Sequence, residues 1–175
     1  LVAGPSKIQF SKDIKVKNVV SGDQMMNEIK KTLPVDIAVC VAAISDFKPK
    51  KIHKNKIKKE EGVFSFIEFE KNLDILSFLG KNNKSRPKIV VGFSAETEDL
   101  INNSLKKLKN KYCDLIIAND VSKKDIGFNS DYNEVTVIDK RGKIKFLPKN
   151  KKSFIANTIA KIILDKILIN DKNIN

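Results

Sequence analysis

Three short apolar runs stand out along a mostly polar chain, and they predict the central strands of a buried sheet. The runs are Asp36–Val41, Lys88–Phe93 and Asp114–Ala118. Strands that are apolar on both faces are typical of parallel sheets covered by helices on two sides. Near the start of the chain, Leu1–Ala3 predicts the end of another strand, and Ile14–Val20 predicts a short alternating one.

Helical patterns fill the stretches around these runs. The predicted helices are Ser21–Thr32, Asn72–Gly80, Thr97–Lys111 and about Lys151–Leu168. Ser21 is expected to cap the first helix, with Gln24 three residues later as its capping-box partner. Asn72 is expected to cap the second, which ends near Gly80. Leucines at helical spacing define the third helix, and an apolar stripe rich in isoleucine defines the last.

Two further regions alternate between apolar and polar residues, which predicts antiparallel strands. Val63–Glu70 is expected to form a half-buried strand that pairs with Lys56–Glu61 through a turn at Gly62. Asn133–Ile138 and Lys143–Leu147 are expected to form a hairpin around the turn DKRGK.

Buried strands that alternate with helices predict an α/β fold: a Rossmann-like, three-layer parallel sheet with an antiparallel hairpin extension. Residues 1–168 would form this domain, and residues 169–175 a polar tail. Ligands of such sheets bind beyond the carboxyl ends of the strands. The stretches that follow these ends are Ala42–Asp46, Gly92–Glu96 and Ala118–Asp120. Their polar residues either line one crevice or serve as ordinary caps and turns.

Composition limits the classes of function. A chain of 175 residues has room for one domain with a substantial core. The net charge of +13 is compatible with a polyanionic partner. Lysine is the default solvated residue throughout, however, so charge alone is weak evidence for nucleic acid binding. No apolar run approaches the roughly 20 residues that span a bilayer, so no membrane partner is expected.

The start of the sequence and the two cysteines indicate the context in which the chain works. It starts without an initiator Met and without a signal peptide, so it looks like a piece of something longer. Cys40 and Cys113 both lie in or beside apolar runs, which favours buried free thiols in the reducing cytoplasm over a disulfide. One histidine and two cysteines do not make a convincing zinc site.

Several familiar catalytic patterns are missing. The sequence contains no GxGxxG after a strand, no GxxxxGK[ST], and only seven glycines. Any bound phosphate would therefore be held by lysine side chains or helix N-termini. A Ser/His/Asp set is also absent, because the one histidine, His53, lies in a basic tract and is expected to be exposed.

Six strings in order carry a resemblance to a known family. They are AAISDF, KIKK, KNLDIL, VGFSAET, KKLKNKYCDLIIANDVS and GFNSDYNEVTVI. Together they resemble the bacterial phosphopantothenate–cysteine ligase domain, the C-terminal half of a bifunctional coenzyme A biosynthesis flavoprotein, from about Leu1 to Leu168. The resemblance implies that CTP, with Mg²⁺, activates the carboxylate of 4′-phosphopantothenate as an acyl-cytidylate. The amine of cysteine then attacks, giving the amide and CMP.

The resemblance also implies particular site residues. The nucleotide-binding set is Cys40, Val41, Ala42, Asp46, Lys56, Leu73, Asp74, Ile75, Leu76, Phe93, Lys107 and Lys111. Lys56, the first lysine of KIKK, falls on the family's catalytic lysine, which would stabilise charge at the α-phosphate and acyl centre. At Leu73 the family usually has a proline. Asn119 is a substrate-binding candidate. The resemblance assigns no residues as metal ligands.

The lysines fall into two groups with different interpretations. Lys107 and Lys111 are four residues apart, so they share one helix face and would reach the triphosphate as a pair. Lys106 and Lys109 remain ordinary solvated residues, as do Lys58 and Lys59 of the basic tract.

The sequence departs from the family at its start. The family's domain begins with an SNxSSGKMG-like segment that carries a catalytic asparagine, and this segment is not in the sequence. The flavin-dependent decarboxylase half, which would bind FMN, is not in it either. Three alternatives stay open: a fragment, a split-gene product whose second chain supplies these parts, or a non-catalytic nucleotide-binding or assembly remnant. The family also implies a homodimer, which the hairpin would help to build.

Overall fold

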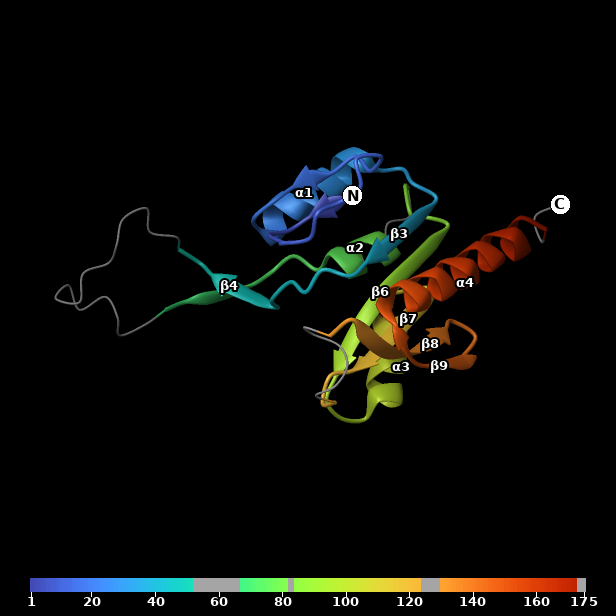
Figure 1. Ribbon diagram of the computed structural model, residues 1–175. Helices are drawn as coiled ribbons and strands as arrows, with labels where there is room; N and C mark the ends of the chain where they lie inside the picture. The colour runs from blue at the N-terminus through green and yellow to red at the C-terminus, as the bar shows by residue number, and fades with distance from the viewer. Residues whose placement is uncertain (52–66, 82–83, 124–129, 173–175) are drawn as a thin grey trace. The chain divides into compact units, whose positions relative to one another are not determined.

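The computed structural model describes residues 1–51, 67–81, 84–123 and 130–172 (Figure 1). The chain forms two compact units. The first unit consists of Leu1–Thr32 and Ala42–Asp74, and the second of Leu33–Val41 and Ile75–Asn175.

In the first unit, a small parallel pair precedes a capped helix. Strand β1 (Val2–Ala3) pairs with β2 (Lys17–Asn18), and α1 (Gly22–Thr32) follows. The strand predicted at Ile14–Val20 is therefore much shorter, because the Ile14 amide donates to Ser11 in a turn instead of a ladder.

The cap predicted for α1 is confirmed. The Gln24 amide donates to the Ser21 hydroxyl at 3.2 Å. The Gln24 side chain reaches back in turn, although it accepts from the Val20 amide, at 2.8 Å, rather than from Ser21 itself.

The first unit also contains a two-stranded antiparallel ribbon. Strand β4 (Phe47–Pro49) pairs with β5 (Phe69–Lys71). The pairing predicted between Lys56–Glu61 and Val63–Glu70 lies outside the described residues, apart from the end of the second strand. Half-burial of that strand is not borne out at Phe69, which is 61% exposed. A ribbon of two strands has no second layer to cover this face.

The second unit is built on a five-stranded mixed sheet with the order β3-β6-β7-β8-β9 (Figure 1). Its strands are β3 (Ile37–Cys40), β6 (Ile89–Glu96), β7 (Leu115–Asp120), β8 (Tyr132–Asp139) and β9 (Ile144–Lys151). The first three strands are parallel, and the last two form an antiparallel hairpin. The predicted parallel sheet with a hairpin extension is confirmed.

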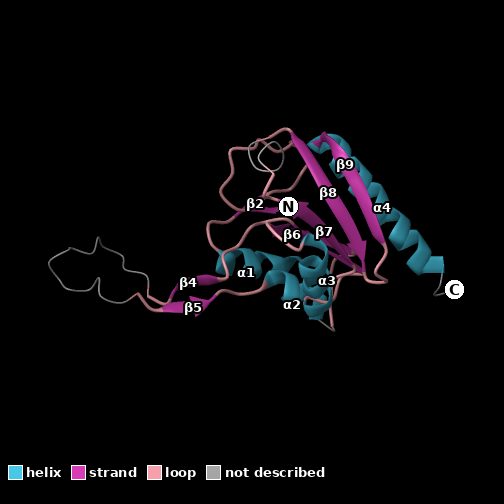
Figure 2. Cartoon of the chain, turned by 90° about the horizontal axis from the view of Figure 1, so that it is seen from below, coloured by secondary structure: helices cyan, strands magenta, loops and turns pink. Residues whose placement is uncertain are grey.

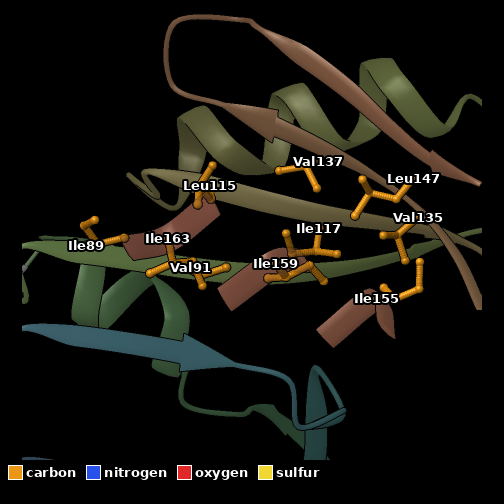
Figure 3. Packing of buried hydrophobic residues seen from close by; sticks show 10 residues of the cluster. All are labelled: Ile89, Val91, Leu115, Ile117, Val135, Val137, Leu147, Ile155, Ile159 and Ile163. Carbon is orange, nitrogen blue, oxygen red and sulfur yellow. The ribbon is translucent and has the colours of Figure 1, made fainter. Parts of the chain in front are cut away.

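Helices cover both faces of this sheet. They are α2 (Ile75–Lys81), α3 (Leu100–Asn110) and α4 (Lys152–Lys172). One face presents Val91, Ile117 and Val137, among other apolar residues, to Ile155 and Ile159 of α4 (Figure 3). Figure 2 shows α4 running along β8 and β9. Helices α2 and α3 pack on the opposite face, where Leu76 of α2 meets Gly92 of β6, which completes three layers.

The burial of the parallel strands differs from strand to strand. Val90, Val91 and the apolar residues of β7 are fully buried, as predicted. The prediction is wrong for β3, where Val39 is 47% exposed. Within the described residues β3 pairs only with β6, so it is an edge strand with a neighbour on one side.

The cap predicted for the second helix is also wrong. Asn72 lies three residues before α2, which starts at Ile75. Its side-chain oxygen accepts from the Leu73 amide at 3.0 Å, forming a local turn rather than a helix cap. The predicted end of the helix near Gly80 is confirmed, since α2 ends at Lys81.

Cys40 and Cys113 are not joined by a disulfide. Cys113 is buried as expected, and burial raises the pKa of its thiol to about 12. Cys40 is only half-buried because it lies on the edge strand β3. Among the described helices, α4 included, none is both long and apolar enough to cross a membrane.

Gly80 of α2 packs directly on the C-cap of α3, which gives a stability prediction. A Cβ at Gly80 would lie 1.9 Å from the Lys111 carbonyl oxygen, and this atom belongs to rigid backbone. Ala normally stabilises a helix by about 0.5–1 kcal/mol relative to Gly. The clash reverses that sign, so Gly80→Ala should lower the free energy of unfolding by about 3 kcal/mol, measured by urea denaturation. Gly4→Ala is the control, because a Cβ there meets nothing within 4 Å. Equal stability of the two variants would contradict the packing.

Candidate functional site

The carboxyl-terminal parts of the three parallel strands bring several predicted site residues into register. Cys40 pairs with Gly92, and Phe93 pairs with Ile117. Asn119, further along β7, pairs with Ala95. The Oδ1 atom of Asn119 is buried and has no hydrogen-bond partner among the residues that the structure describes. A buried acceptor of this kind is suited to a donor on a ligand.

The first turn of α2 joins this cluster. A Cβ at Gly92 would lie 2.5 Å from Leu76, so the side chain of Leu76 rests directly on the backbone of β6. Leu76 therefore lies on the face of the sheet to which Gly92 points, beside the paired residue Cys40, whereas the side chain of Phe93 packs on the opposite face, against the core cluster that α4 covers. Ile75 is 6% exposed, so its side chain belongs to the core and only its backbone is left for a ligand.

The lysine pair lies elsewhere in the second unit. Lys107 is in the last turn of α3, and Lys111 is its C-cap. Because α3 runs back from the end of β6 to the start of β7, this turn is remote from the strand-end residue Asn119. Helix α2 connects this turn to Leu76, because Leu76 lies in the first turn of α2 and Gly80, near its other end, packs on Lys111. Helix α2 has seven residues, so it spans about 10 Å between the two places.

Other predicted residues lie in the first unit. The Asn72 amide donates to the Asp46 carbonyl oxygen at 2.8 Å, so Asp46 and the stretch Leu73–Asp74 are neighbours. Their side chains are exposed, as is Ala42. Val41, at the edge of the second unit, is 60% exposed. The catalytic candidate Lys56 lies outside the described residues.

Other strand-end polar residues bond to one another, as expected of turns. Ser94 is 1% exposed, and its hydroxyl donates to the Glu96 carboxylate. Asp120 accepts from both the amide and the hydroxyl of Ser122, which closes a local turn. The capping interpretation therefore describes Asp120 well.

Sequence patterns missed a buried ionic network at the amino end of the sheet. Asp114 accepts from Arg86, from Lys140 and from the Val90 amide, at 2.8, 2.8 and 2.9 Å. Burial raises the pKa of Asp114, but the hydrogen bonds from Lys140, Val90 and Arg86 outweigh it and hold the pKa below its usual range. An Asp directly before a buried strand was the signal available in the sequence.

This network predicts acid sensitivity. A carboxylate whose pKa is lowered by folding stabilises the protein above its unfolded pKa of about 4, and this stabilisation is lost as the pH falls through the folded pKa. Asp114→Asn should therefore destabilise the chain by about 3 kcal/mol at pH 7 and by clearly less below pH 3. Urea denaturation across this range measures the difference. Asp165→Asn, at an exposed position on α4, is the control. A difference independent of pH would contradict the prediction.

The comparison with protein families shows to which family the chain belongs. The model described as "DNA/pantothenate metabolism flavoprotein C-terminal domain" matches residues 1–167. The chain belongs to this family. Membership confirms the resemblance drawn from the six sequence strings.

Relatives of the flavoprotein C-terminal domain family agree. The coenzyme A biosynthesis bifunctional protein CoaBC of Borreliella burgdorferi is 36% identical over 165 residues, which cover 93% of this chain and 41% of that protein. The protein of the same name from Bacillus subtilis is 42% identical over 113 residues, which cover 65% of this chain and 27% of that protein. The matched part of the chain thus spans less than half the length of either relative.

Solved structures confirm the fold. A crystal structure of the C-terminal domain of CoaBC has a TM-score of 0.75 at 28% identity, covering 97% of this chain and 74% of that one. A Cab2 mutant in complex with phosphopantothenate-cysteine has a TM-score of 0.64 at 18% identity, covering 90% of this chain and 55% of that one. At that identity the second match supports the fold alone.

Proposed function

We propose that this chain is the nucleotide-binding part of a CTP-dependent phosphopantothenate–cysteine ligase. The observation that carries the proposal is the joint presence of two features in the second unit. Cys40 and Leu76 lie beside the β6 backbone at Gly92 and leave backbone for a nucleotide, and Phe93, the next residue of β6, supplies an aromatic ring from the other face of the sheet. The helix α2 then leads from Leu76 to Lys107 and Lys111, which supply positive charge without any glycine-rich loop. Family membership supports the same chemistry.

The proposed reaction has two steps. A carboxylate oxygen of 4′-phosphopantothenate attacks the α-phosphorus of CTP, and pyrophosphate leaves with the electrons of the broken P–O bond. The cysteine amine then attacks the acyl carbon, CMP leaves, and the amine loses a proton. A free carboxylate is a poor electrophile, so activation is what makes amide formation feasible.

The chain's residues have distinct roles in this scheme. Lys107 and Lys111 neutralise the triphosphate, and Asp46 contacts the nucleotide. Lys56 stabilises the charge that develops at the α-phosphate and acyl centre. The buried Oδ1 of Asn119, which has no hydrogen-bond partner among the described residues, accepts a hydrogen bond from the substrate, for example from the amide N–H of the substrate.

The divalent cation would enter with the triphosphate. Within the described ranges, no three His, Cys, Asp or Glu side chains gather as a metal site. This fits Mg²⁺, which commonly keeps several waters and binds through substrate phosphates with only one or two carboxylates. The proposed substrate is therefore magnesium CTP.

A homodimer is part of the proposal. The hairpin carries exposed apolar side chains at Ile144 and Phe146, which are 48% and 56% exposed. A second copy that covers this surface would shield these residues from water. Sedimentation that shows only monomer at micromolar concentration would contradict a dimer.

A chimera tests the ligase activity. Residues 1–167 would replace the matched region of the Borreliella burgdorferi relative, so that the rest of that protein comes from the relative. With 4′-phosphopantothenate, cysteine and magnesium CTP, the chimera should form phosphopantothenoylcysteine, CMP and pyrophosphate. The 175-residue chain by itself should form none, because the resemblance places the catalytic asparagine in a segment before the matched strings. A well-folded but inactive chimera would favour the non-catalytic remnant.

A further inference from the structure

Arg86 makes an unusually complete set of hydrogen bonds. Its Nε donates to the Gly80 carbonyl oxygen at 3.0 Å, and its Nη1 donates to the Pro87 carbonyl oxygen at 2.8 Å. Its Nη2 donates to the Tyr112 carbonyl oxygen at 3.0 Å and to the Asp114 carboxylate at 2.8 Å. The planar fork of a guanidinium can satisfy four acceptors at once, which a lysine ammonium cannot do in this geometry.

These acceptors lie at the ends of three elements. Gly80 is in the last turn of α2, Tyr112 follows the C-cap of α3, and Asp114 precedes β7. Asp114 is itself held by the Val90 amide of β6 and by Lys140. The guanidinium therefore fixes the ends of both helices to the sheet.

Lys111 stands at the centre of this arrangement. Its amide donates to the Lys107 carbonyl oxygen, and its own carbonyl oxygen contacts Gly80. The next residue, Tyr112, has a φ of 55° and so ends α3 in the left-handed region. Terminal helical turns fray readily, and here the carbonyl directly after the turn is held by Arg86.

We propose that Arg86 is a positioning residue for the triphosphate: it holds the last turn of α3 so that Lys107 and Lys111 present their charges together. The inference rests on the proposed function, because it needs the lysine pair to bind phosphate. Arg86 has no role in contacting the nucleotide. Ile75 and Leu76 lie at the opposite end of α2 from Gly80, so the main effect falls on the lysines that bind the β- and γ-phosphates. CMP, which lacks these phosphates, should be almost insensitive.

The test compares CTP and CMP binding by calorimetry on the full chain. Arg86→Gln and Arg86→Lys should each weaken magnesium CTP binding by about tenfold and leave CMP binding within about twofold. Rescue by lysine is not expected, because it keeps the charge but loses the fork. Arg141→Gln is the matched control, since Arg141 is exposed at the hairpin tip.

The outcomes separate this inference from the proposed function. Wild-type chain that binds no CTP overturns both. Wild-type binding with unchanged CTP affinity in the folded Arg86 variants overturns the inference alone. Equal losses for CTP and CMP also overturn it, since they would show a merely structural role.

A measurement on the wild type covers variants that fail to fold. The amides of Lys111, Tyr112 and Cys113 donate to carbonyl oxygens in the last turn of α3. If Arg86 holds this turn, these amides should already exchange slowly in the free chain, well below the rate of a frayed helix end. Exchange in the free chain as fast as in an unstructured peptide would overturn the inference.

Discussion

Replacing both Lys107 and Lys111 by glutamine is expected to weaken magnesium CTP binding by about a hundredfold. A hydrogen bond to a charged group contributes about 1.5–3 kcal/mol, and both side chains are only half-buried, so the lower value applies to each. The sum of about 3 kcal/mol corresponds to roughly a hundredfold in affinity. CMP binding should change little, because the lost contacts are to the outer phosphates. Calorimetry measures both ligands.

The control for this pair lies on the same helix. Lys106 and Lys109 are exposed, and replacing both by glutamine removes the same net charge. Only long-range attraction should be lost, and at physiological salt it is largely screened. If this control weakens CTP binding as much as the first variant does, the lysines act through total charge and the assigned pair is wrong.

Lys56→Gln is expected to slow amide formation in the active chimera by about a hundredfold. The reason is that loss of one aimed charge-stabilising group typically costs on the order of 3 kcal/mol in the transition state. Binding of CTP should weaken far less, because the charge to be stabilised develops only during the reaction. Single-turnover rates and separate calorimetry distinguish the two effects.

Lys58 and Lys59 are the controls for Lys56. Both lie in the same basic tract, and both are interpreted as solvated, so their glutamine variants should retain nearly full rates. A loss at Lys58 or Lys59 comparable to that at Lys56 would remove the special role of Lys56. A loss in CTP affinity as large as the loss in rate would make Lys56 a ground-state binding residue instead.

Local chemistry made much of the fold predictable. The apolar runs at β6 and β7 correspond to fully buried strands, and the Ser21 cap forms as its sequence requires. Where prediction failed, the deciding factor was tertiary. Burial of β3 depends on how many neighbours a strand has, which its own residues do not reveal. Asn72 has the right chemistry for a cap, but its side chain bonds locally to Leu73.

The candidate site was predictable only in part. Spacing alone puts Lys107 and Lys111 on one helix face, and the strand ends follow from the α/β pattern. The sequence does not reveal that the lysines lie beside the end of α2, because this depends on the absence of a side chain at Gly80. The Arg86–Asp114 pair was likewise out of reach, since its partners are 28 residues apart and most of its acceptors are backbone carbonyls.

Calorimetry of magnesium CTP with the purified, monodisperse 175-residue chain tests the central claim most directly. The account predicts saturable binding of CTP, tighter than that of CMP, and tighter than that of duplex DNA at physiological salt. Salt dependence distinguishes binding of CTP from binding of duplex DNA, because the affinity for DNA falls steeply as the salt concentration rises. No detectable CTP binding by the folded chain would contradict the account. Tighter binding of duplex DNA would contradict it as well, and would assign the positive charge to nucleic acid.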